Sequence, residues 1–467
     1  MGLSHRLARL VAEPDECIVD AAALEWATWM VLDSVSVAIA GSRLARETTL
    51  RTANVFAALV ANGRAVAWPI GRRLSPAGAA ASNATAIHSI DFDDSYMAGG
   101  VKAHFSASIV PTALAVAEHE GRSGRDALNA IVRGFEVAAR LGHLVSPSMV
   151  ERWHPTGTLG VVGCAATTAS LFGLDVNTTE RALGLAADHA AGTRFCLAAG
   201  DATKSLHAAF AAHDGIAAAT MARGGIDGPL GFFEGLKGYV ESYTTAEAEA
   251  AWDDVGRGRP LIELNCTKFF PVMHALHAAV AVGLELAASH PVASSREIAE
   301  ITVVQSTTHA SFGAYWSPET ELAARLSLPF AIGATLLEGA CGVDQFRRSL
   351  LDDTEFRALV QRVRIEPSAS IEQEYGSRVA SEVRVRWTDG TQGSGFAADP
   401  LGFPERPALP AQRISKARAL CNRVMSEAET DELIEMLRTI AEMPRLDSLA
   451  DRLALVGDLR SDTTGTR

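Results

Sequence analysis

Four segments of the chain place histidines and lysines inside runs that are otherwise apolar and rich in glycine and alanine. They are HSIDFDDSYMAGGVKAH (88–104), WHPTGTLG (153–160), TKSLHAAFAAHDG (203–215) and TKFFPVMHALH (267–277). The chain has only five lysines, and three of them, Lys102, Lys204 and Lys268, fall in these segments. Such groups are costly to bury unless they are partnered or used. The pattern therefore predicts buried helices around a pocket for an anionic substrate, with proton-transfer groups in its wall.

The composition limits the possible classes of protein. Hydrophobic residues make up 48% and charged residues 21% of the 467 residues, which is typical of a soluble globular protein with two or three domains. The net charge of −13 argues against a nucleic-acid or anionic-membrane surface, so anion binding must come from a local pocket. The six cysteines form no CxxC pair, which favours reduced thiols, and the N-terminus lacks an apolar signal core. We therefore expect a cytoplasmic protein that does not bind membranes or nucleic acid.

Sequence patterns also predict how the chain is organised. Ser123 with Asp126 forms a capping-box pattern before apolar residues at helical spacing, and 203–223 is predicted as another helix. Strand patterns appear near 298–303 and 363–365, and Val383, Val385 and Trp387 alternate with arginines before a Thr-Asp-Gly turn. We expect a mainly α fold with a smaller α+β domain. A large helical bundle domain would take residues 1–267 and 403–467, an α+β lid domain 268–402, and strands would be confined to about 296–396.

Several longer strings carry a resemblance to a known family. They include NATAIHSIDFDDSY, WHPTGTLGVVGCAATTASLFGLD, KSLHAAFAAHDGIAAATMARGGIDGP, KFFPVMHALHAAV and ARLSLPFAIGATLLEGACGVDQF. Together they resemble the MmgE/PrpD family, which includes 2-methylcitrate dehydratases, cis-aconitate decarboxylases and iminodisuccinate epimerases. The resemblance spans roughly residues 20–400 and implies a helical domain with an α+β lid, assembled as a homodimer. The chain departs from the family pattern at Phe105, where proline is common, at Ser205, where arginine is common, and at Met273, where cysteine is common.

The resemblance also implies which residues form the active site. Reactions of this family move a proton at a carbon next to a carboxylate, which needs a base, an acid and cationic groups for the carboxylate. The implied catalytic residues are His104, His154, Lys204 and Asp91, and Ser95 is implied in substrate binding. Lys268, near the expected domain boundary, and His274 and His277 in the same segment are further candidates for substrate binding. In this scheme His154 or Lys204 takes the proton and His104 serves as the acid. One pocket at the domain junction should hold His104, His154, Lys204 and Lys268.

Other residues and other functions remain open from the sequence. His274 and His277 share a helix face and could pair on a metal, but no third ligand is evident, so we expect neither a metal nor an organic cofactor. Asp93 and Asp94 could be helix caps, and His207 and His213 could hold structural hydrogen bonds. The sequence favours a cofactor-independent lyase, a dehydratase or decarboxylase, for a small di- or tricarboxylate. An epimerase with the same proton-transfer groups and a catalytically silent binding protein are the alternatives.

Overall fold

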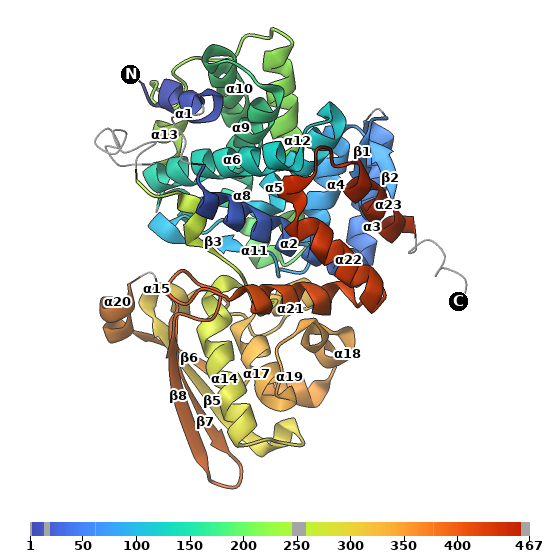
Figure 1. Cartoon of the computed structure of the whole chain (residues 1–467). Coiled ribbons are helices and arrows are strands. Elements are labelled where there is room, and N and C mark those ends of the chain that lie inside the picture. Colours follow the sequence, from blue (N-terminus) through green and yellow to red (C-terminus); the bar gives the residue numbers. More distant parts are fainter. Residues whose placement is uncertain are drawn as a thin grey trace.

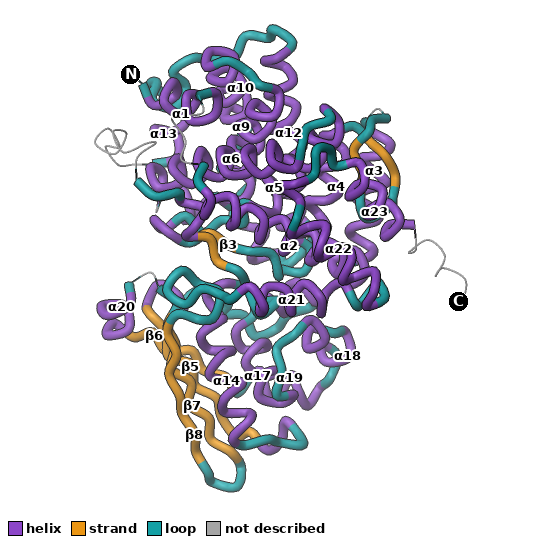
Figure 2. Tube along the Cα trace, viewed as in Figure 1, coloured by secondary structure: helices purple, strands orange, loops and turns teal. Residues whose placement is uncertain are grey.

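The computed structural model describes residues 2–13, 19–60, 62–146, 148–244, 258–376 and 378–458. A large helical unit forms the upper part of the molecule in Figure 1, and a smaller unit with the main sheet lies below it. Figure 2 shows that most of the strand residues lie in the lower unit. The predicted fold class, mainly α with a smaller α+β part, is thereby confirmed.

The helical unit is built from long helices with many small residues. They are α1 (Leu3–Ala12), α2 (Ala21–Leu44), α3 (Arg46–Leu59), α4 (Pro76–His88), α5 (Ser106–Glu120), α6 (Gly124–Val145), α9 (Gly160–Phe172), α10 (Val176–Asp188) and α12 (Thr203–Arg223). A Cβ atom at Gly134 of α6 would lie only 2.6 Å from the carbonyl oxygen of Gly163 in α9, so these two helices approach closely because of their glycines. Short helices complete this unit, namely α7 (Ser148–Arg152), α8 (Pro155–Thr158), α11 (Phe195–Ala199) and α13 (Tyr239–Tyr243).

The end of the chain returns to the helical unit. Helix α21 (Pro410–Cys421) lies between the two units in Figure 1 and is followed by α22 (Glu427–Arg438) and α23 (Asp447–Asp458). The Lys416 ammonium of α21 lies 2.6 Å from the Asp33 carboxylate of α2. Helix α2 is long and apolar enough to cross a membrane, but most of its apolar window is buried within the protein, as is usual for a core helix.

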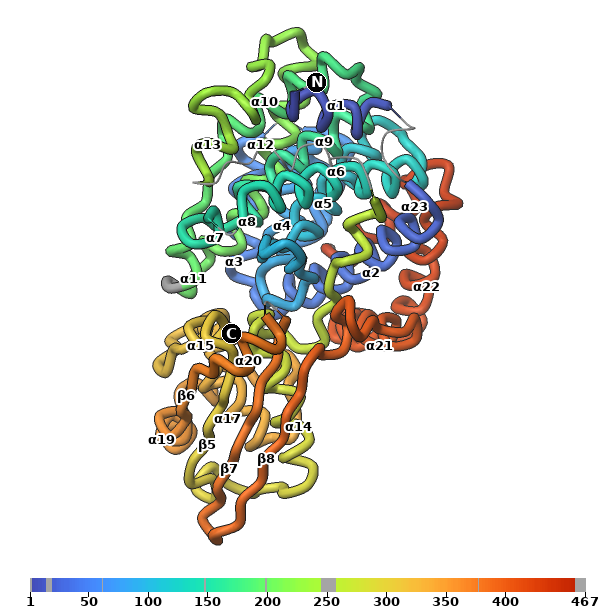
Figure 3. Tube along the Cα trace, turned by 90° about the vertical axis from the view of Figure 1, so that its left-hand side faces the viewer, coloured from blue at the N-terminus to red at the C-terminus, as the bar shows by residue number. Residues whose placement is uncertain are grey.

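The smaller unit is a four-stranded sheet covered by helices. The strand order is β6 (Val363–Ser368), β5 (Ile298–Ser306), β7 (Ala380–Trp387) and β8 (Gln392–Ala398), and only the β5–β6 pair is parallel. Val383 and Val385 are buried, whereas Arg384 and Arg386 are exposed, which confirms the predicted alternation in β7. Figure 3 shows the sheet and its helices from the side. The helices of this unit are α14 (His277–Ser289), α15 (Thr307–Ala310), α16 (Glu321–Arg325), α17 (Leu328–Glu338), α18 (Arg348–Leu351), α19 (Thr354–Val360) and α20 (Ala369–Tyr375).

Apolar packing is concentrated in two places. The largest buried apolar cluster of the described residues is built between Leu3 and Ile262 and between Ala417 and Val456. The second is built between Val272 and Trp387, where α14 and α17 pack on the sheet. The boundaries proposed above for the two domains, and the homodimer, stay predictions.

The expectation that strands are confined to about 296–396 is wrong. Two short antiparallel pairs lie outside that range: β1 (Ala65–Ala67) with β2 (Arg72–Leu74), and β3 (Ser95–Tyr96) with β4 (Asn265–Cys266). Strands of two or three residues are too short to show a period of two in the sequence. The β3–β4 pair matters for function because it holds the segment after α4 beside the segment that leads to Lys268.

Candidate active site

The centre of the site is the loop that follows α4. Helix α4 ends at His88, and Asp91, Asp93 and Asp94 follow before β3. Asp91 has a φ of 50°, in the left-handed region that residues other than glycine rarely adopt. Neither Asp93 nor Asp94 caps a helix, so the alternative of a capping role is wrong for both. Their carboxylates instead contact side chains in the interior.

Two lysines from distant segments converge on Asp91. The Lys204 ammonium lies 3.0 Å and the Lys268 ammonium 3.1 Å from Asp91 Oδ1, and Lys268 also donates to the Asp91 carbonyl oxygen at 3.0 Å. All three side chains are buried. Burial alone would raise the pKa of Asp91, but the two ammonium groups bring it well below its ordinary value of 3.8. Asp91 is therefore a carboxylate that holds two cations together.

A second carboxylate orients two histidines. Asp93 Oδ2 lies 2.8 Å from His88 Nδ1 and 3.1 Å from His104 Nδ1, and the Asp94 carbonyl oxygen lies 2.7 Å from His104 Nδ1. Because carboxylate and carbonyl oxygens only accept, Nδ1 carries the proton in both rings. Lys204 donates to His88 Nε2 at 2.9 Å, whereas no contact with a described residue occupies His104 Nε2. Burial lowers the pKa of His88 to about 3 and also lowers the pKa of His104, so both rings are neutral at pH 7.

His154 precedes α8 and belongs to a chain of polar contacts. Its Nδ1 lies 3.0 Å from His207 Nδ1, and its Nε2 lies 3.3 Å from Thr156 Oγ1. Burial, with Lys204 as the next cause, lowers the pKa of His154 well below 6.5. His207 thus has the hydrogen-bond partner expected of a structural histidine, and His213 pairs with Asp214 at 2.8 Å.

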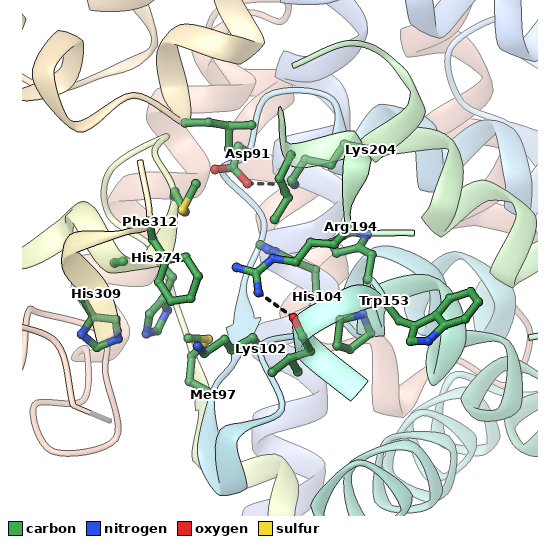
Figure 4. A pocket seen from close by; sticks show the side chains of 17 residues that line it. Asp91, Met97, Lys102, His104, Trp153, Arg194, Lys204, His274, His309 and Phe312 are labelled. Carbon is green, nitrogen blue, oxygen red and sulfur yellow. Dashed lines mark hydrogen bonds and ion pairs between the residues drawn. The ribbon is translucent and has the colours of Figure 1, made fainter. Parts of the chain in front are cut away.

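One cavity between the two units brings most of the predicted site together. Asp91, His104, His154, Lys204 and His274 all line it. Figure 4 shows Asp91 and Lys204 at one end of this cavity and Lys102 at the other. Three of the four residues expected to share one pocket therefore do so.

The remaining predicted residues lie behind the wall of the cavity. Lys268 is completely buried and reaches the site through Asp91. Ser95 Oγ lies 2.8 Å from His274 Nδ1, so Ser95 supports a lining residue. His277 is completely buried beside Phe270 and Phe403, and neither of its ring nitrogens has a hydrogen-bond partner among the described residues. Direct contact of Ser95, Lys268 or His277 with a substrate stays a prediction.

The sequence patterns did not single out several residues of the site. His88 and Asp93 lie inside the first His/Lys segment, but only the folded chain shows that Asp93 bridges two imidazoles. Arg194, His309 and Phe312 also line the cavity, and they come from segments without a distinctive pattern. For Lys102, the only sequence signal is its place among the clustered lysines. The clustering was a usable signal for it.

Two groups of side chains have the composition of metal ligands. His88, Asp93 and His104 form one, and His154, Cys196 and His207 form the other, with their ligand atoms within 4.8 Å of one another. In the first group Asp93 already binds both Nδ1 atoms. In the second, burial raises the pKa of the Cys196 thiol to about 11, which disfavours the thiolate that a metal needs. Independence from metals stays a prediction. A loss of turnover on chelation, restored by one metal, would contradict it.

Comparisons with known proteins identify the family. Residues 5–250 match the MmgE/PrpD N-terminal domain and residues 270–442 the MmgE/PrpD C-terminal domain. The chain is 28% identical over 396 residues to a cis-aconitate decarboxylase of Homo sapiens, covering 79% of this chain and 78% of the relative. It is 24% identical over 454 residues to a cis-aconitate decarboxylase of Aspergillus terreus, covering 92% of this chain and 91% of the relative. Both domain matches cover most of the sequence in the expected order, and the chain belongs to the MmgE/PrpD family.

Proposed function

We propose that this member of the family is a cofactor-independent lyase that decarboxylates an unsaturated tricarboxylate of the cis-aconitate type. The observation that carries the proposal is the cavity in which no described residue contacts His104 Nε2 while Lys204, held by Asp91, supplies a cation. The similarity to cis-aconitate decarboxylases supports this choice among the reactions of lyases.

The proposed reaction needs one proton and one place for negative charge. The bond between the substrate's CH₂ group and its leaving carboxylate breaks, and that electron pair forms a new carbon–carbon double bond. The electrons of the old double bond take a proton at the carbon next to a second carboxylate, and carbon dioxide leaves. Lys204 stabilises the charge that gathers on this second carboxylate. His104 or His154 gives the proton and regains one from solvent.

The electrostatics of the site fit this cycle. Both candidate acids are neutral in the free protein because burial and nearby lysines lower their pKa values. A bound polyanion would oppose the effect of the lysines and raise these pKa values, since an opposite charge favours the protonated ring. The acid would then form only when the substrate is present, which limits loss of the proton to water.

The test is turnover of cis-aconitate in deuterated buffer, with 2-methylcitrate assayed in parallel. We expect one carbon dioxide and one product carrying one deuterium per substrate consumed. Loss of water from 2-methylcitrate without decarboxylation of cis-aconitate would instead identify a dehydratase. Label exchange into a remaining dicarboxylate substrate, without carbon dioxide, would identify an epimerase. Binding of polycarboxylates without any turnover would leave the binding-protein alternative.

A further inference from the structure

Two cations that line the cavity share one aromatic ring. The Lys102 ammonium lies 4.2 Å and the Arg194 guanidinium carbon 4.6 Å from the centre of the Phe312 ring. Lys102 and Arg194 belong to the helical unit, whereas Phe312 follows α15 in the smaller unit. All three line the same cavity, as Figure 4 shows. Cation–π contacts hold the two positive groups in place without neutralising them.

No carboxylate of the described residues forms an ion pair with either cation. Neither Lys102 nor Arg194 has an ion-pair partner among these residues, and the side-chain hydrogen bond of Arg194 goes to the Val150 carbonyl oxygen at 2.5 Å. Carboxylates are plentiful in this protein, which carries 55 acidic residues against 42 basic ones. Two like charges held on one ring repel each other, so a bound anion would stabilise them.

The backbone adds an independent observation. Lys102 has a φ of 55°, and it is one of four described residues other than glycine with positive φ. Asp91 is another, and both line this cavity. Such conformations cost about 1–3 kcal/mol and cluster at functional sites. Lys102 is half-buried and lines the cavity, whereas Lys237, which has a similar φ, is exposed.

We propose that Lys102 and Arg194 form an anion subsite that binds a carboxylate of the substrate that does not react. The inference rests on the proposed function and deepens it: the subsite selects tricarboxylates over dicarboxylates. Lys102 lies at the opposite end of the cavity from the Asp91–Lys204 pair, so one ligand with several carboxylates would be held at both ends. Because Phe312 comes from the smaller unit, the subsite is complete only when the two units are packed together.

The subsite also gives a pH signature. Burial, and next the neighbouring Arg194, lower the pKa of Lys102 to about 8, and Glu372 opposes the shift. His309 also lies near Lys102, but burial lowers its pKa to about 4, so its charge does not change near pH 8. Lys102 therefore loses its charge as the pH rises through about 8, while Arg194 keeps its own. Affinity for a tricarboxylate should fall above pH 8, and Lys102→Arg should retain it at pH 9.

Calorimetric titration with unreactive acids tests the subsite without requiring turnover. The probes are tricarballylate, which has three carboxylates, and glutarate and methylsuccinate, which each lack one of them. We expect Lys102→Gln and Arg194→Gln to weaken tricarballylate binding by about 10-fold or more, the scale of one charge-assisted contact. In the same variants, the affinity for at least one of the two dicarboxylates should change by less than about twofold. Lys237→Gln is the matched control, since Lys237 is an exposed lysine that also has a positive φ, 58°.

The outcomes separate this inference from the proposed function. Unchanged tricarballylate binding in both variants, or an equal loss for all three acids, would overturn the subsite. Arg194→Lys keeps a charge at that position, so restored binding in this variant would exclude misfolding as the cause of a loss. Selective loss of tricarballylate binding in a protein that does not decarboxylate cis-aconitate would uphold the subsite and overturn only the reaction proposed above.

Discussion

Lys204 donates hydrogen bonds to the Asp91 carboxylate and the His88 imidazole, and it also lines the cavity. We expect Lys204→Met to lower turnover by about 100-fold or more, the scale of a group that acts on the reacting atoms. It should also lower the free energy of unfolding by roughly 3 kcal/mol, since Asp91 would keep only one of its two counter-ions. Steady-state kinetics and urea unfolding measure the two effects. His154→Gln should show the loss of turnover with little loss of stability.

Asp93 should act as a positioning residue. It accepts hydrogen bonds from Nδ1 of both His88 and His104, which keeps Nε2 of each ring free of a proton. Asp93→Asn would place an amide N–H where an acceptor is needed and would favour the other tautomer, a change that strongly impairs catalysis in other carboxylate–histidine pairs. We expect turnover to fall by about 10-fold or more with an unchanged melting temperature. Nitrogen NMR of the imidazoles should show the altered tautomer, and an unaltered spectrum with full activity would contradict this role.

Single residues of the site differ in how far the sequence predicts their position. A histidine or lysine in an apolar run signals a buried cation or proton carrier, and this signal predicted the cavity placement of His104, His154 and Lys204. It could not predict that Lys268 lies behind Asp91, because spacing in the sequence does not tell which face of a wall a buried side chain occupies. The sequence does not reveal the role of Asp93 for a similar reason, since its contacts with two histidines depend on the path of the loop.

At the scale of elements, the loop between β3 and α5 carries both Lys102 and His104. Gly99 and Gly100 in this loop have positive φ, 61° and 77°. A Cβ atom at Gly99 would overlap the His143 ring, whose Nε2 lies 2.8 Å from the Tyr96 hydroxyl oxygen. A Cβ atom at Gly100 would meet only Ser146, at 3.9 Å. The two glycines therefore make a matched pair. A side chain at either position would suffer the same kind of backbone strain, but only at Gly99 would it also collide with a neighbour.

We expect Gly100→Ala to destabilise the protein by about 1 kcal/mol and to leave the KM nearly unchanged. Gly99→Ala should cost about 2–4 kcal/mol and raise the KM, because the loop must move away from His143 and carry Lys102 with it. Thermal unfolding and kinetics on both variants provide the measurement. Equal effects from the two substitutions would mean that this contact does not hold the loop.

Elements with a strong local signal were predicted well. The capping box at Ser123 and Asp126 marks the start of α6, and the alternation in β7 marks a strand with one buried face. Helix α10 likewise begins after a capping residue, Asp175, whose side chain accepts a hydrogen bond from the Thr178 N–H. The two-residue β3–β4 pair carries no local signal at all. Its register depends on segments about 170 residues apart, which only the complete fold brings together.

The interior of the molecule holds many neutral histidines. Burial lowers the pKa values of a set that includes His88, His104, His154, His274, His277 and His309. In the unfolded chain these rings bind protons near pH 6.5, whereas in the folded protein they do so only at lower pH. The unfolded state therefore binds more protons below pH 6.5, and the free energy of unfolding falls as the pH decreases through that range.

His277 allows this linkage to be measured at one residue. Burial lowers its pKa from 6.5 to about 3, so its share of the stability lost between pH 7 and pH 5 is about 2 kcal/mol. His277→Leu removes the titrating ring from a fully buried position beside Phe270 and Phe403, where an apolar side chain fits the surroundings. Urea unfolding measures the free energy of unfolding at pH 7 and at pH 5. The decrease between the two pH values should be smaller in the variant than in the unmodified protein by that amount. An identical drop in both proteins would show that His277 is not a source of the acid sensitivity. A loss of turnover in a stable variant would instead support the substrate contact expected from the sequence.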